Sequence, residues 1–378
     1  MNMGFALPSL RQWHHAIGCI IVFTSSLISP IEAFGQTKSY VVTDLSGEEA
    51  SGVPSKLNNS GDIAGRLFSA SEHGTRAAIW NHSGFERKHV RKYVGALLGG
   101  DYSSASDIND AGQVVGASNT SKGVLPFIWT TTGGLQSVPL LRGDSCGQAN
   151  GINKHGHIVG YSSGLNGAKA FLWTHGTGVR KLEILPGGNY SRAQGVNDFD
   201  EVVGTSESTA GERAVLWTKT GGVRDLGTLP GGSASKAAAI NNGGDVVGYS
   251  TGPHGMRAFL WTKDNGMEDL GVLPGGDSSR ALAISNMGEV VGSSTSTSGD
   301  RAFIWTKETG MMDLNNGSSA DLGIVLFEAH SINDKGQIIA MGKNSSEGSM
   351  GNMLASPQHE DCAPAPPAAF LLTPIAAK

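Results

Sequence analysis

The sequence predicts an all-β protein, a seven-bladed β-propeller of four-stranded antiparallel blades, with a β-solenoid as the alternative fold. Three observations predict it: a long-period repeat, short β-branched or aromatic segments, and turn residues between them. Five tryptophans recur every 44 residues, and a sixth lies 49 residues earlier. Such a period is typical of units that bury apolar surface against their neighbours. The tryptophans, expected to pack in the outer part of each blade, are Trp80, Trp129, Trp173, Trp217, Trp261 and Trp305.

Each repeat contains four apolar segments, and residues 281–314 give a complete copy. The segments are four to six residues long and end at Gly, Asn, Asp or Ser, which is typical of strands. They lack a clean polar alternation, so we expect both faces of each sheet to be covered. The alanine-rich segment has the smallest residues and is predicted to be innermost. Val-Val-Gly, Phe-Leu-Trp and Asp-Leu follow outward as the second, third and fourth strands.

An Asn-x-x-Gly turn joins the first two strands, because glycine adopts the positive φ that ends a short hairpin loop. One copy has Asp200 in place of the glycine, and we expect the same left-handed turn there. Seven copies of the second segment predict seven blades. Residues 40–45 look like an outermost strand, and residues 369–372 like a third strand without a fourth. We therefore expect these segments to pair and close the ring, which removes exposed sheet edges.

The chain of 378 residues has 55 glycines, 16% charged residues and a net charge of −5. Abundant glycine without excess proline favours many tight turns. The charge offers no basic field for nucleic acid or anionic membranes, so no nucleic-acid partner is expected. The sequence shows no nucleophile elbow, phosphate loop or zinc-binding cysteine pair. We therefore predict no cofactor and no metal.

The N-terminus resembles a secretory signal, predicted to span residues 1–33. Arg11 supplies the basic residue, residues 16–28 form a short apolar core, and Ala33 suits cleavage. A short linker (34–39), a single repeat domain (40–373) and a tail (374–378) would follow. We expect a secreted or cell-surface protein without a membrane span after signal removal, with the periplasm and a retained membrane anchor as alternatives.

Two cysteines remain after signal removal, Cys146 and Cys362. Secretion permits a disulfide between them, and two separate thiols are the alternative. A loop rich in Ser, Gly and Pro, about residues 342–367, is expected in the last blade. The tripeptide at 142–144, Arg-Gly-Asp, occupies a turn position of its repeat and is interpreted as a turn.

The consensus Asp-Leu-Gly-x-Leu-Pro-Gly-Gly, Ala-x-x-Ile-Asn-x-x-Gly-x-Val-Val-Gly and Ala-Phe-Leu-Trp resembles the bacterial HAF family of extracellular repeat proteins. The resemblance covers about residues 40–372. It implies secretion or surface exposure, and it implies no established reaction. The histidine that precedes Ala-Phe in the family is Arg, Lys or Pro here, as at Arg257, Lys169 and Pro126, which argues against a metal role.

Candidate ligand-binding residues precede the inner strands. If these strands line a channel, the side chains would ring its mouth, and three adjacent basic residues could meet an anionic ligand such as an acidic glycan. Solvated loop residues are the alternative. The five positions are Ser104, Gln148, Arg192, Lys236 and Arg280.

The function we expect is a monomeric, non-catalytic binding scaffold for an extracellular glycan, protein or other anionic ligand. One alternative is a polysaccharide lyase or hydrolase at the axial mouth, which would need converging carboxylates. The loop aspartates Asp101, Asp144, Asp277 and Asp321 are scattered and not paired in register. The other alternative is a purely structural surface protein.

Overall fold

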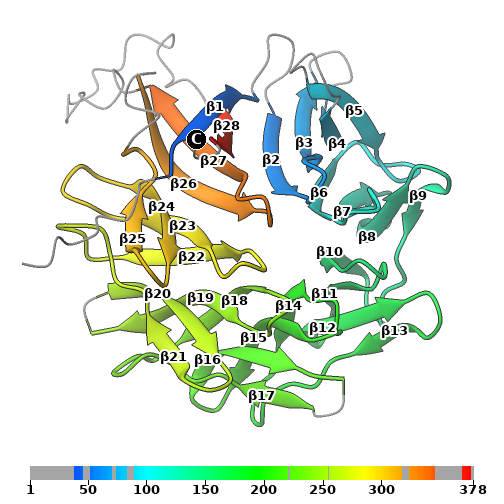
Figure 1. The fold of residues 1–378 in the computed structure, drawn as a ribbon. Coiled ribbons are helices and arrows are strands. Elements are labelled where there is room, and N and C mark those ends of the chain that lie inside the picture. The colour runs from blue at the N-terminus through cyan, green and yellow to red at the C-terminus, as the bar shows by residue number, and fades with distance from the viewer. Residues whose placement is uncertain are drawn as a thin grey trace, which may run out of the picture. The chain divides into compact units, whose positions relative to one another are not determined.

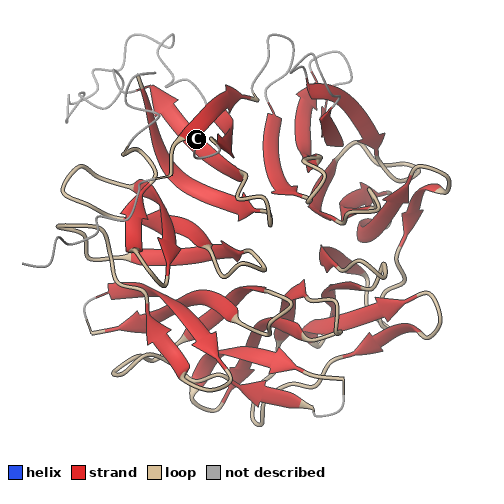
Figure 2. Cartoon of the chain, viewed as in Figure 1, coloured by secondary structure: helices blue, strands red, loops and turns tan. Residues whose placement is uncertain are grey.

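The computed structural model describes residues 38–45, 52–69, 74–82, 89–219, 222–253, 255–316, 323–344 and 368–375. Residues 37–378 form one compact unit. Within the described ranges every regular element is a strand, and the strands form seven four-stranded antiparallel sheets arranged in a ring (Figures 1 and 2). The predicted seven-bladed propeller is confirmed. The expected signal peptide lies outside the described residues.

The blades are numbered from the first complete sheet, and each is given from its inner to its outer strand. Blades 1 to 3 are β2 (Gly52–Leu57), β3 (Ile63–Ser69), β4 (Gly74–His82) and β5 (His89–Gly95); β6 (Ser103–Ile108), β7 (Val114–Thr120), β8 (Gly123–Thr130) and β9 (Gly134–Ser137); and β10 (Cys146–Ile152), β11 (Ile158–Gly164), β12 (Gly167–Thr174) and β13 (Gly178–Lys181).

Blades 4 to 6 repeat this pattern. They are β14 (Ser191–Val196), β15 (Val202–Ser208), β16 (Gly211–Trp217) and β17 (Val223–Asp225); β18 (Ser235–Ile240), β19 (Val246–Gly252), β20 (Gly255–Thr262) and β21 (Gly266–Asp269); and β22 (Ser279–Ile284), β23 (Val290–Ser294), β24 (Arg301–Thr306) and β25 (Gly310–Asp313). Blade 7 is β26 (Ile324–Ile332), β27 (Ile338–Asn344), β28 (Ala368–Pro374) and β1 (Tyr40–Asp44).

The missing polar alternation has a direct structural cause in the second strands. Val246 and Val247 are both fully buried, but in different cores. Val246 packs with Phe259 and residues of blade 4, whereas Val247 packs with Val290 and other residues of blade 6. Successive side chains point to opposite faces of a strand, so a blade between two neighbours needs apolar residues at both positions.

The glycine that follows each valine pair marks a close approach of the inner strand. A Cβ atom on Gly248 would lie 2.0 Å from the carbonyl oxygen of Lys236 and 3.0 Å from the Cα of Ala237. The inner strand has a bulge at this point, between Ala237 and Ala239. All seven inner strands carry a bulge at this place, and β26 has a second one between Leu326 and Glu328.

The turn at Asp200 has the predicted geometry. Its φ is 62°, the only positive φ of a described residue other than glycine, and its N–H donates to Asn197 O at 3.2 Å. Asn and Asp tolerate this left-handed region better than other side chains. The Asn-x-x-Gly pattern therefore persists here with aspartate as its last residue.

The ring closes as expected, with the N-terminal strand as the outermost strand of the last blade. β1 pairs with β28 (Figure 1). In this pairing Val42 lies opposite Leu372. An ion pair between Lys38 and Glu289 extends the closure from the N-terminal segment to blade 6. This pairing rules out the solenoid, in which the two segments would lie far apart. Among the described residues no helix is long and apolar enough to cross a membrane.

Candidate functional site: an axial cavity inside a belt of asparagines

A belt of asparagine side chains joins the blades at the end where the inner strands finish. Asn197 shows the pattern: its Oδ1 accepts from the backbone N–H groups of Phe199 and Glu201, both at 3.0 Å, and fixes its own turn. Its Nδ2 donates to Asn241 O of the next blade at 3.1 Å. The same bond to the next blade, at 3.0–3.4 Å, is made by Asn58, Asn109, Asn153, Asn241 and Asn333.

One joint of the belt differs. In blade 6 the position belongs to Ser285, whose hydroxyl accepts from the N–H groups of Met287 and Glu289 at 3.3 and 3.2 Å. A serine is too short and has no amide donor, so the bond from blade 6 to Asn333 of blade 7 is not made in the described structure. The belt is therefore open at the blade that the N-terminal strand closes.

The residue after each belt position forms a second rim of bonds between blades. Asp198 N–H donates to Asn242 Oδ1 at 3.0 Å, and Asn242 N–H donates to Asn286 Oδ1 at 2.8 Å. Blade 3 places Lys154 in this rim. It has no acceptor atom, and its Nζ pairs with Asp198 at 3.3 Å. The rim carries three carboxylates, which already accept backbone or side-chain N–H groups: Asp110, Asp198 and Asp334.

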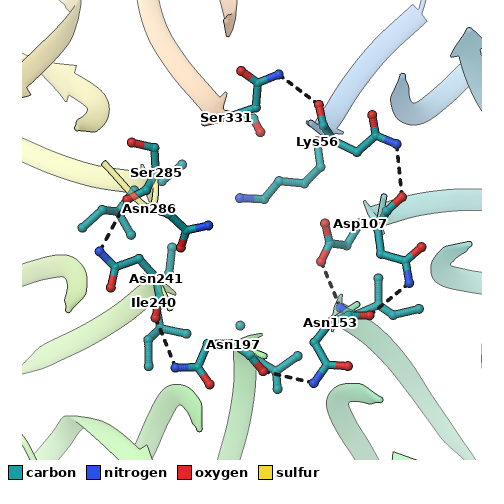
Figure 3. A pocket seen from close by; sticks show the side chains of 18 of the residues that line it. Lys56, Asp107, Asn153, Asn197, Ile240, Asn241, Ser285, Asn286 and Ser331 are labelled. Atoms are coloured by element: carbon teal, nitrogen blue, oxygen red, sulfur yellow. Dashed lines mark hydrogen bonds between the residues drawn. The ribbon is translucent and has the colours of Figure 1, made fainter. Parts of the chain in front are cut away.

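Inside the belt lies a cavity of about 240 Å³, lined by residues of all seven inner strands (Figure 3). Two charged side chains enter it, Lys56 from β2 and Asp107 from β6. Both occupy the second position before the belt residue. The other five blades have small residues there, which leave the centre open: Gly151, Gly195, Ala239, Ala283 and Ser331.

The amino group of Lys56 extends toward the middle of the cavity (Figure 3) and has no hydrogen-bond or ion-pair partner among the described residues. The Asp107 carboxylate, by contrast, accepts the backbone N–H groups of Ile108 and Ile152, both at 2.9 Å. Lys56 is thus a charged side chain of this wall for which the described residues provide no hydrogen-bond partner, whereas they provide two for Asp107.

Burial lowers the pKa of the Lys56 amino group, and the negative charge of Asp107 opposes this effect. Burial likewise raises the pKa of the Asp107 carboxyl group, opposed by Lys56 and by the N–H groups of Ile152 and Ile108. Both shifts have the same origin: low polarisability around the cavity penalises charge. A ligand carboxylate that enters the cavity would oppose the effect of burial on Lys56, as Asp107 does.

The five residues expected at the channel mouth lie at the other end of the inner strands, away from the belt. They lie within the strands, not before them, because pairing with the second strand already starts at the preceding residues. None of the five is among the residues that line the axial cavity. They are Ser104, Gln148, Arg192, Lys236 and Arg280.

The basic members of this set contact the preceding blade. The Arg192 guanidinium lies 4.5 Å from the ring centre of Tyr161, and that of Arg280 lies 5.9 Å from the ring centre of Tyr249. Lys236 pairs with Glu212 at 2.9 Å. Gln148 Nε2 donates to Ser106 Oγ at 3.2 Å, also in the preceding blade, and Ser104 is half-buried.

All six repeated tryptophans lie on third strands, and Trp80, Trp129, Trp217 and Trp261 are buried. Cys146 is half-buried, whereas Cys362 lies outside the described residues, so the disulfide stays a prediction. The loop expected around 342–367 also lies outside them from residue 345 onward.

The sequence interpretation missed Lys56 and Asp107. The sequence does mark them, because the position two residues before the belt residue holds Gly, Ala or Ser in the other five copies of the repeat. Aligning the copies on the belt asparagine would have exposed them. The divergent blades 1 and 2 therefore carry the charge that the regular central copies lack.

No protein-family model matches the chain, and no curated protein matches it. Solved structures share its fold. Virginiamycin B lyase from Staphylococcus aureus is 12% identical, with a TM-score of 0.53 over 90% of this chain and 100% of that one. The propeller domain of the Trilobed protease from Pyrococcus furiosus is 10% identical, with a TM-score of 0.50 over 79% and 91% of the two chains.

A puromycin hydrolase mutant is 11% identical, with a TM-score of 0.53 over 78% of this chain and 50% of that one. At such identities these similarities show the propeller fold alone, because one fold supports many unrelated activities. The Trilobed protease domain has an open velcro topology. In this chain, β1 closes the ring on β28.

Proposed function

We propose that this chain is a secreted or cell-surface, non-catalytic binding protein of the HAF repeat type. In this proposal its axial cavity holds the carboxylate of a small ligand on the amino group of Lys56. The observation that carries the proposal is the free amino group of Lys56 at the centre of a cavity that all seven blades enclose. The N-terminal signal pattern and the repeat consensus support the extracellular location.

The charges around the cavity narrow the ligand class. The cavity is lined by two amino groups, those of Lys56 and Lys154, and by four carboxylates, which belong to Asp107, Asp110, Asp198 and Asp334. A polyanion such as an acidic polysaccharide would be repelled by this rim. A single carboxylate that reaches Lys56 gains a charge-assisted hydrogen bond to a half-buried amino group. A zwitterion fits best, since its ammonium group would face the acidic rim.

Ligand binding should be accompanied by proton uptake. A ligand carboxylate stabilises the charged form of Lys56 and raises the pKa that burial lowers in the free protein. The complex therefore binds protons more strongly than the free protein, and affinity falls as the pH rises above the pKa of free Lys56. Titration calorimetry in two buffers of different ionisation enthalpy measures this uptake.

The direct test uses the exported full chain and three probes: glycine, glycolate and citrate. We expect glycine and glycolate to bind and citrate to bind less well. Lys56→Met should weaken glycolate binding at least ~10-fold, since a hydrogen bond to a charged group contributes about 1.5–3 kcal/mol. Lys154→Met, on the rim of the same cavity, serves as the matched control and should retain binding. Equal affinities in the parent and Lys56→Met, or no binding of any probe, contradict the proposal.

A further inference from the structure

A second cavity, of about 150 Å³, lies between blades 6 and 7, near the start of their inner strands. It is lined by hydroxyl side chains of blade 6 together with Arg280, Asp300, Phe327 and Glu328. Its volume is about ten times what a single water molecule requires. None of these residues lines the axial cavity, so the two sites are distinct.

Blade 7 differs from the other blades at this place. Its inner strand β26 has an additional bulge between Leu326 and Glu328, whereas each of the other six inner strands has one bulge. Bulges redirect side chains and are frequent next to functional sites. Leu326 packs in the core shared with blade 6, and Phe327 packs against the core shared with blade 1. Glu328 follows the bulge and faces the cleft.

The polar groups of this cleft are fixed and oppositely charged. Glu328 lies 2.6 Å from Nε2 of His330, and this contact, assisted by the charge of Arg280, lowers the pKa of the Glu328 carboxyl group against the effect of burial. Glu328 is therefore an ionised acceptor at neutral pH. The Arg280 guanidinium, close to the ring of Tyr249, supplies donors. Asp300 adds a second carboxylate at the exposed side.

Several of the hydroxyl side chains that form one wall of the cleft already make hydrogen bonds within the protein. Ser279 Oγ donates to Gly271 O at 2.6 Å, and Ser294 Oγ accepts from Leu273 N–H at 3.0 Å. Thr295 Oγ1 donates to Asp277 Oδ1 at 3.0 Å. These bonds hold the wall rigid. Ser293, opposite Arg280 in the strand register, already contacts the Glu328 carboxylate. The groups left to a ligand are the guanidinium of Arg280 and the remaining acceptor positions of the two carboxylates.

We propose that this cleft binds a ring of a neutral sugar. Each hydroxyl group of a sugar both donates and accepts, so neighbouring hydroxyls can donate to the carboxylate of Glu328 and accept from Arg280. The two carboxylates exceed the charge of the guanidinium by one, which disfavours an acidic sugar and leaves a neutral one as the ligand. Rigid, preorganised partners reduce the entropy lost on binding. The site extends the proposed binding function to a second ligand class and does not depend on Lys56.

The test is a glycan array of neutral and acidic glycans probed with the full chain, followed by affinity measurements on the best neutral glycan. Glu328→Gln removes a charged acceptor at nearly constant shape, and we expect it to weaken binding at least ~10-fold. Ser293→Phe fills the cleft from the neighbouring strand, and we expect it to abolish binding. Thermal unfolding shows that each variant is folded.

Two control variants separate the sites. Lys236→Met alters the equivalent position of blade 5, and Lys56→Met alters the axial cavity; both should retain the neutral glycan. Three results overturn the inference: no neutral glycan is retained, both cleft variants bind like the parent, or Lys56→Met removes glycan binding. The last result would assign the glycan to the axial cavity. Loss of glycolate binding in Lys56→Met with retention of the glycan supports both sites separately.

Discussion

Replacing one asparagine of the belt tests how strongly the belt joins the blades. Asn197 is 3% exposed and makes four bonds: two that it accepts within its turn, one to Asn241 O, and one to Glu201 Oε2 at 2.6 Å. Asn197→Ser should keep the accepted bonds, as Ser285 does, and lose both donated ones. With about 1 kcal/mol for each bond, we expect a loss of about 2 kcal/mol in the free energy of unfolding.

The reverse substitution gives the sharper test, because it predicts a gain. Ser285→Asn supplies the missing amide donor to the carbonyl group of Asn333 and should add about 1 kcal/mol. Urea unfolding measures both variants, and the transition midpoints should move in opposite directions at an unchanged m-value. A lower midpoint for Ser285→Asn would refute the idea that this joint is an open link of the belt.

Two further predictions concern single contacts. Trp217 Nε1 donates to Glu183 O at 2.7 Å, whereas the buried Nε1 of Trp80 has no described partner. In equilibrium unfolding, Trp217→Phe should therefore lower the free energy of unfolding by about 1 kcal/mol more than Trp80→Phe does. A larger loss for Trp80→Phe contradicts this. Although burial favours its neutral form, contacts led by His157 lower the pKa of Asp200 below 3.8. This stabilisation is present above about pH 4 and disappears as the pH falls through the folded-state pKa. Acid titration of stability should therefore show that the deficit of Asp200→Asn at pH 7 shrinks as the pH falls below about 4.

Much of the fold could be predicted from the sequence because each strand and turn pattern recurs in several copies of the repeat. The sizes of the residues around Ala237 and Val246 placed the strands in the right radial order, and the unmatched segments at 40–45 and 369–372 predicted the closure. The turn at Asp200 followed from the conformational tolerance of aspartate. These features depend on local geometry and on packing against identical neighbours, which a consensus expresses directly.

The sites were harder to predict because they lie where the copies differ. Lys56 and Asp107 face the axis only because a bulge rotates the last residues of each inner strand, and a bulge leaves little trace in an apolar pattern. Arg192 and Lys236 contact Tyr161 and Glu212 of the preceding blade, and the sequence did not predict these contacts. Which residues of neighbouring blades lie side by side is set by tertiary packing and cannot be predicted from the pattern of a single repeat.

The pairing of β1 with β28 has a consequence for the order of folding. During synthesis β1 is completed long before its partner, and it must wait until the last blade exists. Loop-closure entropy grows only slowly with chain length, and the folded blades in between hold the two ends close together, so the final pairing is entropically mild. Until then the nascent protein exposes unpaired strand edges that can capture another copy. We therefore expect β1, the first of the described strands to be made, to pair last, and the half-closed ring to be the species most exposed to aggregation.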